Sequence, residues 1–335
     1  MPTARKWYAK ESRVGCSSDR WGKTKITMSL ELLGHIELPE HVRSDGFDHA
    51  AVHRALGRLY VAHTANDALE VLDSIDDRYL HSIPKLPGVA GALVSDEQNL
   101  IFTSNRGENT VGIFAPDDEA GLVRISVGIR PNGLAYDPHN DLLLAANVGA
   151  PDIPNSFTLS LVKVKERRIV ASVSVPGRTR WTVFDAAAGV FYVNIADPPQ
   201  IVVVASNDPA RTTRTIAIPA LGPHGLDFDL ERRRLFCACD AKRLVVLEAD
   251  SGEVSKQLQL SGSPDVIFFN LLLRHLYVAI GDPGIMEVFE TKMLKRIETI
   301  QTEPGAHTIG FDAERNKLYA FLPKTHRAAV YADKG

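Results

Sequence analysis

The sequence predicts an all-β fold built from a repeated unit of four short strands. Two observations carry this prediction. Short apolar stretches separated by turn residues run through most of the 335 residues, and strands rather than helices account for the pattern. In addition, a corner containing Gly or Pro, followed by a strand, a turn and a second strand, recurs about every 40–45 residues.

The chain begins with a segment that precedes the repeat. Residues 1–28 are basic and polar, and they contain no apolar stretch long enough for a secretory signal. We therefore expect residues 1–28 to form an arm outside the repeat and residues 29–335 to form one domain. The stretch LELLGHIELP, residues 30–39, is typical of a strand but has no repeat unit of its own.

Seven copies of the repeated corner follow. They begin at Ser44, Gly88, Ile129, Gly177, Leu221, Ser261 and Pro304. A third strand such as ALEVLD (68–73) and a fourth such as RTIAIPA (214–220) complete the unit. Four strands in about 40–45 residues are typical of a β-propeller blade. The seventh copy ends after its third strand, so we predict a seven-bladed β-propeller in which residues 30–39 complete the last blade and close the ring.

Two stretches resemble a known repeat family. LYVAHTANDALEVLD (59–73) and IFTSNRGENTVGIFAPD (101–117) are similar to the YVTN-type repeat, in which a second strand ends in Asn and a short turn leads to an Asn-Thr-Val-like third strand. The resemblance extends over roughly residues 29–333. It implies a seven-bladed propeller similar to the lactonase-like ones. Propellers of this kind include enzymes, binding proteins and scaffolds, so the resemblance implies a fold more strongly than a function.

Composition narrows the classes of partner. The formal net charge of -3 provides no excess of Lys and Arg, so neither nucleic acid nor an anionic membrane is expected as a partner. No apolar run reaches the roughly 18 residues of a membrane span. The absence of a P-loop and of a dinucleotide-binding Gly-rich turn indicates no nucleotide cofactor. We expect a cytoplasmic protein with a small-molecule substrate. The sequence leaves the oligomeric state open, and a monomer is compatible with it.

The repeat also predicts where a site would lie. In a propeller the innermost strands line a central channel, and the corners before them meet at one mouth. Counting five residues back from the turn residue Asp137 and from its equivalents gives one corner position per blade. These positions are 41 to 48 residues apart: Asp48, Gly91, Asn132, Arg180, His224, Asp265 and His307. In a closed ring, His224, Asp265, His307 and Asp48 would lie side by side.

Two histidines and two aspartates at equivalent corners suggest chemistry, and three interpretations stay open. The four side chains could bind one divalent metal ion (Zn, Mn, Fe or Ni) that polarises a carbonyl or activates water. They could instead work without a metal, as a His general base oriented by an Asp. They could also be structural, since polar corner residues satisfy loop amides.

Other residues are candidates for substrate binding. Arg180 and the neighbouring Trp181 offer a planar cation and an aromatic face to a carboxylate, phosphate or oxyanion. Asn132 could hydrogen-bond beside them, or it could simply form a turn before Gly. His63 ends a second strand, where the other blades place mostly turn-forming Asn and Asp. We therefore expect either a hydrolase that hydrolyses or opens a lactone- or ester-like or carbonyl-bearing substrate, or a non-catalytic propeller that binds a ligand or a protein.

Overall fold

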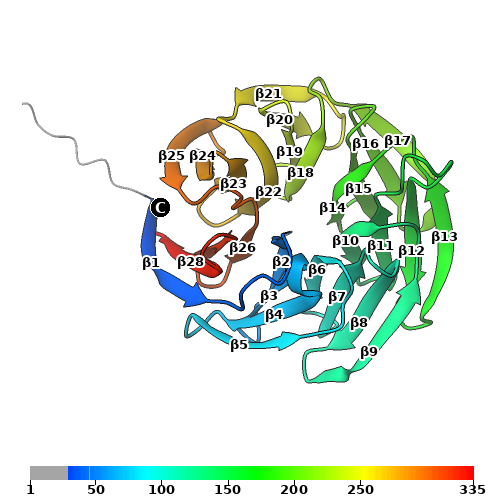
Figure 1. Ribbon diagram of the computed structural model, residues 1–335. Coiled ribbons are helices and arrows are strands. Elements are labelled where there is room, and N and C mark those ends of the chain that lie inside the picture. The colour runs from blue at the N-terminus through cyan, green and yellow to red at the C-terminus, as the bar shows by residue number, and fades with distance from the viewer. Residues whose placement is uncertain (1–28, 45) are drawn as a thin grey trace, which may run out of the picture.

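The computed structural model describes residues 29–44 and 46–335, and the predicted arm (residues 1–28) lies outside them. Within the described residues, 28 strands form seven four-stranded antiparallel sheets around a central axis (Figure 1). One 3₁₀ turn, η1 (Thr64–Asn66), is the only helical element in this part of the chain. The predicted seven-bladed β-propeller is confirmed.

The first four blades use consecutive strands from the channel outward. Blade 1 contains β2 (Phe47–His53), β3 (Arg58–His63), β4 (Ala68–Asp73) and β5 (Arg78–Ile83). Blade 2 contains β6 (Val89–Ser95), β7 (Leu100–Asn105), β8 (Thr110–Ala115) and β9 (Asp118–Ser126). Blade 3 contains β10 (Pro131–Asp137), β11 (Leu142–Asn147), β12 (Thr158–Lys163) and β13 (Arg168–Ser174). Blade 4 contains β14 (Thr179–Asp185), β15 (Val190–Ile195), β16 (Gln200–Ala205) and β17 (Asp208–Ala217).

The last three blades follow the same order until the ring closes. Blade 5 contains β18 (Pro223–Asp229), β19 (Arg234–Cys239), β20 (Arg243–Glu248) and β21 (Val254–Gln259). Blade 6 contains β22 (Ser263–Asn270), β23 (His275–Asp282), β24 (Ile285–Glu290) and β25 (Lys295–Gln301). Blade 7 contains β26 (Ile309–Asp312), β27 (Lys317–Leu322), β28 (Arg327–Asp333) and β1 (Leu30–Glu37).

The closing strand comes from the other end of the chain, as predicted. β1 pairs antiparallel with β28, from Leu30 opposite Asp333 to Glu37 opposite Arg327. The register shifts between Leu32 and Gly34. This pairing gives blade 7 four strands, as in the other blades, and β28 presents no open edge.

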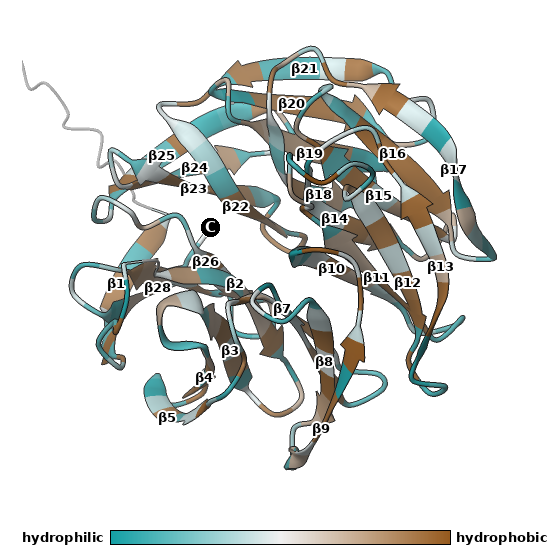
Figure 2. Ribbon diagram, turned by 45° about the vertical axis from the view of Figure 1, so that its right-hand side comes forward, coloured by the Kyte–Doolittle hydropathy of each residue, from teal (hydrophilic) through white to brown (hydrophobic). Residues whose placement is uncertain are grey.

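The hydrophobic core is divided among the gaps between blades. Seven clusters of buried apolar side chains each join two neighbouring blades. Figure 2 shows the hydrophobic stretches along the strands of the blades. β1 contributes to two clusters, because Leu30 packs between blades 6 and 7 and Ile36 packs between blades 7 and 1. The bulge in β1 changes the face that its side chains occupy and so allows both contacts.

Turn residues hold the end of the channel opposite the corners. The carboxylate of Asp229 accepts hydrogen bonds from the amides of Glu231 and Arg232, both at 3.1 Å. Equivalent bonds are made by Asp137, Asp185, Asn270 and Asp312.

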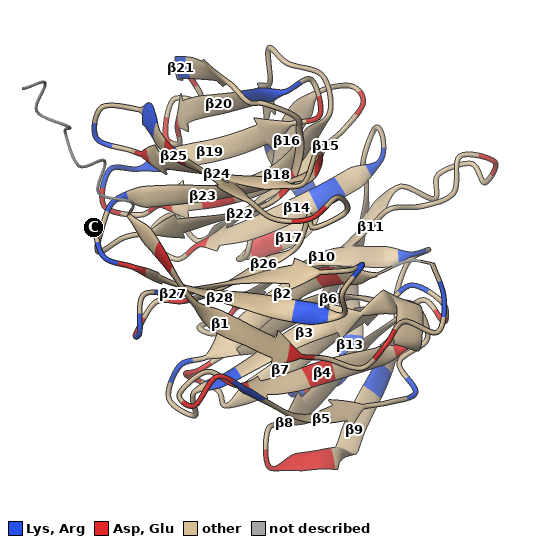
Figure 3. Cartoon of the chain, turned by 60° about the vertical axis from the view of Figure 1, so that its left-hand side comes forward, with Lys and Arg blue, Asp and Glu red and all other residues tan. Residues whose placement is uncertain are grey.

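Figure 3 shows that most charged residues lie in loops and near strand ends. No helix in the described ranges has the length and apolar character to cross a membrane.

Candidate functional site

A local irregularity positions the corner residues. In β2, β10 and β14 the pairing with the next strand of the blade shifts between Phe47 and Ala50, between Pro131 and Leu134, and between Thr179 and Thr182. β18 and β22 shift at the corresponding place. A β-bulge re-aims the side chains at the extra residue. The predicted corner residues of these five blades all lie inside such a shift.

Four corner residues form one connected group with Asp240. Nε2 of His224 lies 3.0 Å from Nη1 of Arg180. Nε2 of His224 also lies 3.1 Å from Oδ1 of Asp265. The other oxygen of Asp265 lies 4.0 Å from Nε2 of His307. On its opposite side, Nδ1 of His224 lies 2.8 Å from Oδ1 of Asp240. The structure thus brings His224, Asp265 and His307 together, as the repeat predicted.

The two carboxylates set the charge of His224. Its side chain is only 15% exposed. Burial and the charge of Arg180 disfavour the imidazolium form, but the charge of Asp265 and the hydrogen bonds with Asp240 and Asp265 outweigh them and raise the pKa of His224 to about 9. Burial also opposes the charge of Asp265, and the positive His224 reverses this effect and holds the pKa of Asp265 well below its usual range. At neutral pH the group is therefore an imidazolium between two carboxylates.

This charge state predicts a pH dependence of stability. A histidine whose pKa is raised by folding stabilises the protein fully below its unfolded pKa of about 6.5, and this stabilisation disappears as the pH rises towards 9. We expect the free energy of unfolding of His224→Gln to fall less than that of wild type between pH 6 and 9.5. The difference should be at most about 1.4 kcal/mol per pH unit. Urea titrations at several pH values measure it, and parallel curves for the two proteins would contradict the assignment.

Asp48, which we predicted to lie beside His224, Asp265 and His307, lies in a neighbouring part of the mouth. Its Oδ2 lies 3.0 Å from Nη2 of Arg106, and its Oδ1 lies 3.3 Å from Nε2 of His49. Asp48 and His307 line the same cavity of about 590 Å³, together with Arg106 and Arg130. Asp48 is therefore part of the mouth but pairs with Arg106 and His49.

Four arginines gather over blades 2 to 4. Burial and then the charges of Arg180, Arg130 and Arg106 lower the pKa of Arg178, so these three guanidinium groups lie near enough to Arg178 to repel it. Arg106 pairs with Asp48, and Arg180 lies 3.5 Å from Asp240. Among the described residues, Arg130 and Arg178 form no ion pair. Such an excess of cations at a channel mouth is suited to an anion.

The remaining predicted residues differ in their positions. The ring of Trp181 lies 4.0 Å from that of His49, centroid to centroid, and Trp181 lines a cavity inside the channel. Asn132 is buried, its carbonyl accepts a hydrogen bond from Ser104, and its side-chain oxygen has no partner among the described residues.

His63 lies away from this group. It is fully buried, and its Nδ1 lies 2.7 Å from Oε1 of Glu70. The ring packs against Phe47 with centroids 4.5 Å apart. Because the interior of blade 1 encloses the imidazole, we do not include His63 in the site.

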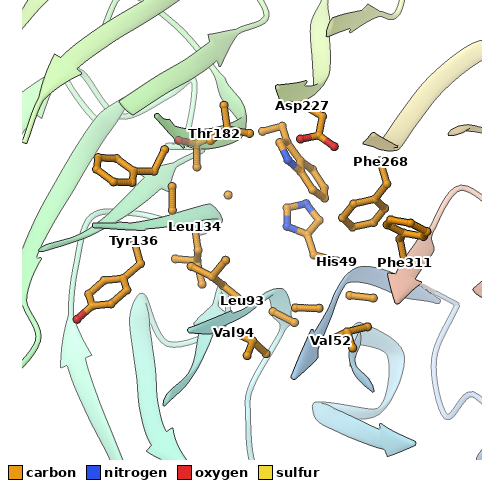
Figure 4. Close-up of a pocket in the computed structure, with 18 of the residues that line it drawn as sticks. His49, Val52, Leu93, Val94, Leu134, Tyr136, Thr182, Asp227, Phe268 and Phe311 are labelled. Atoms are coloured by element: carbon orange, nitrogen blue, oxygen red, sulfur yellow. The ribbon is translucent and has the colours of Figure 1, made fainter. Parts of the chain in front are cut away.

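Below the mouth, the channel contains a second, more apolar cavity of about 310 Å³. Figure 4 shows His49, Phe268 and Phe311 close together at one side of it, with Asp227 nearby. Burial outweighs the hydrogen bonds from the amides of Phe269 and Phe228 and raises the pKa of Asp227 to about 7. Burial also lowers the pKa of His49, and this effect exceeds the attraction of Asp48 and Asp265.

The predicted metal ligands do not form a site for an ion in this arrangement. Within residues 29–44 and 46–335, no group of three or more His, Cys, Asp and Glu side chains is arranged so that it could hold a metal ion. Both ring nitrogens of His224 face carboxylates, and in the imidazolium form neither has a lone pair to give to an ion. The donor set in this arrangement does not fit an ion, and the metal stays a prediction.

The sequence analysis singled out neither Arg106 nor Asp227, and it rated Asp240 as a turn residue. Asp240, Arg106 and Asp227 come from positions other than the corners. Asp240 lies at the end of a second strand, which is the position where we expected mainly turn-forming residues. Because the second strand runs antiparallel to the first, the sequence already places Asp240 at the same mouth, but it does not show that the Asp240 carboxylate pairs with His224. Nothing in the sequence distinguished Asp227 from other acidic strand residues.

Comparisons with known proteins find similarity in the fold but not in the sequence. No protein-family model matches the chain, and no curated protein matches it by sequence. Hydrazine synthase from Kuenenia stuttgartiensis contains a similar chain, with a TM-score of 0.75, 12% identity, and coverage of 87% of this chain and 97% of that one. A chain of the mitotic checkpoint complex is also similar, with a TM-score of 0.76, 8% identity, and coverage of 99% and 98%. At these identities the comparisons show a seven-bladed β-propeller fold alone.

Proposed function

We propose that this protein is a small-molecule enzyme that hydrolyses or opens a lactone- or ester-like substrate by acid-base chemistry at the channel mouth. The observation that carries the proposal is His224, held as a cation between Asp265 and Asp240 and next to Arg180. The resemblance of residues 59–73 and 101–117 to the repeats of lactonase-like propellers supports the choice of substrate.

Each group has a role that its position supports. His224 is charged at neutral pH, so it acts as the general acid that protonates the leaving oxygen when the ester bond breaks. His307 is the more exposed imidazole, 38% exposed against 15% for His224, and it takes the proton from the water that attacks the carbonyl carbon. Arg180 stabilises the negative charge that develops on the carbonyl oxygen. Water supplies the new C–O bond, and an acid and an alcohol result.

The surroundings of His224 bear on two alternatives, a non-catalytic binding protein and a metal-assisted enzyme. The mutual pairing of His224, Asp240 and Asp265 is also what a rigid binding site without chemistry would show, and this favours a non-catalytic ligand-binding propeller as the second candidate. The metal-assisted version requires His224 to turn away from both carboxylates. Elemental analysis of the purified protein tests it, and an ion at near-unit stoichiometry that is lost in His224→Gln would restore the metal mechanism.

A substrate panel tests the proposed activity. We expect purified protein to hydrolyse at least one of γ-butyrolactone, δ-valerolactone, dihydrocoumarin and p-nitrophenyl acetate well above the buffer rate, because the site supplies an acid, a base and an oxyanion partner. A pH-indicator assay measures the acid released. No turnover of any compound, together with a ligand-dependent rise in Tm, would instead support the binding candidate.

A further inference from the structure

The apolar cavity inside the channel is not used by the chemistry proposed above. Its walls are formed by the innermost strands, and among its aromatic residues are Trp181, Phe268 and Phe311. Trp181 and Phe268 meet edge to face with centroids 6.3 Å apart. Figure 4 shows the open space bordered by Leu93, Leu134 and Thr182 on the side away from Phe268. A volume of about 310 Å³ is at the small end of ligand sites and suits a single ring.

This cavity adjoins the charged mouth along two strands. On β2, Asp48 lines the mouth cavity and the next residue, His49, lines the channel cavity. On β14, Arg180 contacts His224 and the next residue, Trp181, lines the channel cavity. In both strands a bulge lies at this pair of residues, so the charged side chain faces the mouth and the next side chain, which is apolar or uncharged, faces the channel cavity. A molecule that spanned the two cavities would have its charged end and its apolar end on opposite sides of this boundary.

We propose that the channel cavity holds the apolar body of the substrate, and that the substrate class is a compact aromatic or alicyclic compound whose carboxylate, or the carbonyl that becomes one, lies at the arginines of the mouth. The reaction part of this statement rests on the proposed function. The binding part does not, since it requires only the aromatic walls of the channel and the four arginines above it. Arg130 and Arg178 matter most for the charged end, because neither forms an ion pair among the described residues, and only the more distant charge of Asp240 acts favourably on Arg178.

The sign of the ligand's charge separates this proposal from its main competitor. Aromatic walls with one carboxylate, here Asp227, can also hold an amine. The arginines instead favour an anionic ligand. Asp227 already accepts hydrogen bonds from the amides of Phe228 and Phe269, at 2.8 and 2.6 Å. Binding of phenylacetate in preference to benzylamine is therefore expected.

NMR titrations with acetate, phenylacetate and benzylamine test the proposal on the full chain. Phenylacetate should bind at least about 10-fold more tightly than acetate, because burying a ring removes apolar surface from water. Benzylamine should bind more weakly than phenylacetate. Equal affinities for acetate and phenylacetate, or tighter binding of benzylamine, would overturn the inference.

Variants locate the ring and the carboxylate. Ala51 on β2 lines the channel cavity, and Ala51→Leu should remove most of the preference for phenylacetate while leaving acetate binding unchanged. Ala187→Leu, in an exposed turn, is the matched control and should change neither. Leu93→Phe narrows the same cavity and replaces Ala51→Leu if that variant does not fold. Arg178→Gln should weaken acetate and phenylacetate alike, by about 5-fold.

These measurements are distinguishable from tests of the reaction. Hydrolysis of γ-butyrolactone and dihydrocoumarin with equal efficiency, without any preference for phenylacetate in binding, would reject the ring site and keep the enzyme. Tight binding of phenylacetate that Ala51→Leu abolishes, without turnover of any lactone, would keep the ring site and reject the enzyme. An unchanged phenylacetate preference in both Ala51→Leu and Leu93→Phe would place the ring elsewhere.

Discussion

Replacing His224 with Gln is expected to lower kcat/KM for the hydrolysed lactone by at least about 100-fold, because Gln can hydrogen-bond to Asp240 and Asp265 but cannot deliver a proton. The pH profile should change as well. With wild type, activity should decline as the pH rises towards 9, where His224 loses its proton. Steady-state rates from pH 6 to 10 measure both effects, and the residual activity of the variant should lack this alkaline decline.

A second histidine–carboxylate pair provides the matched control. Nε2 of His81 lies 2.8 Å from Oε1 of Glu119 on the outer strands of blades 1 and 2, and the imidazole is 44% exposed. His81→Gln should leave the rate unchanged, since this pair is not part of the mouth. If His81→Gln and His224→Gln reduced the rate equally, His224 would have no special role.

His307 separates chemistry from structure at the same site. Its side chain is 38% exposed, and its one ion-pair contact among the described residues is with Oδ2 of Asp265, at 4.0 Å. We expect His307→Ala to abolish turnover with little change in Tm, because an exposed imidazole contributes little packing. A large fall in Tm would identify the ring as a structural element and remove it from the proposed mechanism.

The second large effect concerns closure of the ring. Changing both Leu30 and Ile36 to Ala is expected to lower the free energy of unfolding by about 4–10 kcal/mol, as each large-to-small core change costs about 2–5 kcal/mol. The two side chains are 2% and 4% exposed and belong to different clusters, so their effects should add. Urea unfolding of the single and double variants measures the loss.

The same strand contains its own control. Leu32 and Leu33 also lie on β1, but they are 50% and 46% exposed. Changing both to Ala should alter the free energy of unfolding by less than about 1 kcal/mol. Comparable losses in the two double variants would mean that β1 does not close the ring through its buried side chains.

The architecture could be predicted from the sequence because the signals for a propeller are local and repeated. Each blade contains its own corner and its own inner strands, and five blades contain a turn residue such as Asp229, which accepts hydrogen bonds from the amides two and three residues later. Seven copies and one strand without a blade leave a single way to complete the ring, and β1 pairs with β28 accordingly. The repeat also aligned His224, Asp265 and His307, since equivalent positions around an axis are neighbours whatever their separation in the chain.

Only the tertiary structure decided which side chains meet and in what charge state. Bulges at the start of the innermost strands turn Arg180 towards His224 and Asp48 towards Arg106, and a register shift depends on the pairing partner rather than on the residue itself. The ends of second strands add Asp240 to the group, whereas the interior of blade 1 encloses His63. Ionisation depends on burial and on neighbours, and the largest favourable effect on the charge of His224 comes from Asp265 on the next blade, so one repeat by itself does not determine this charge.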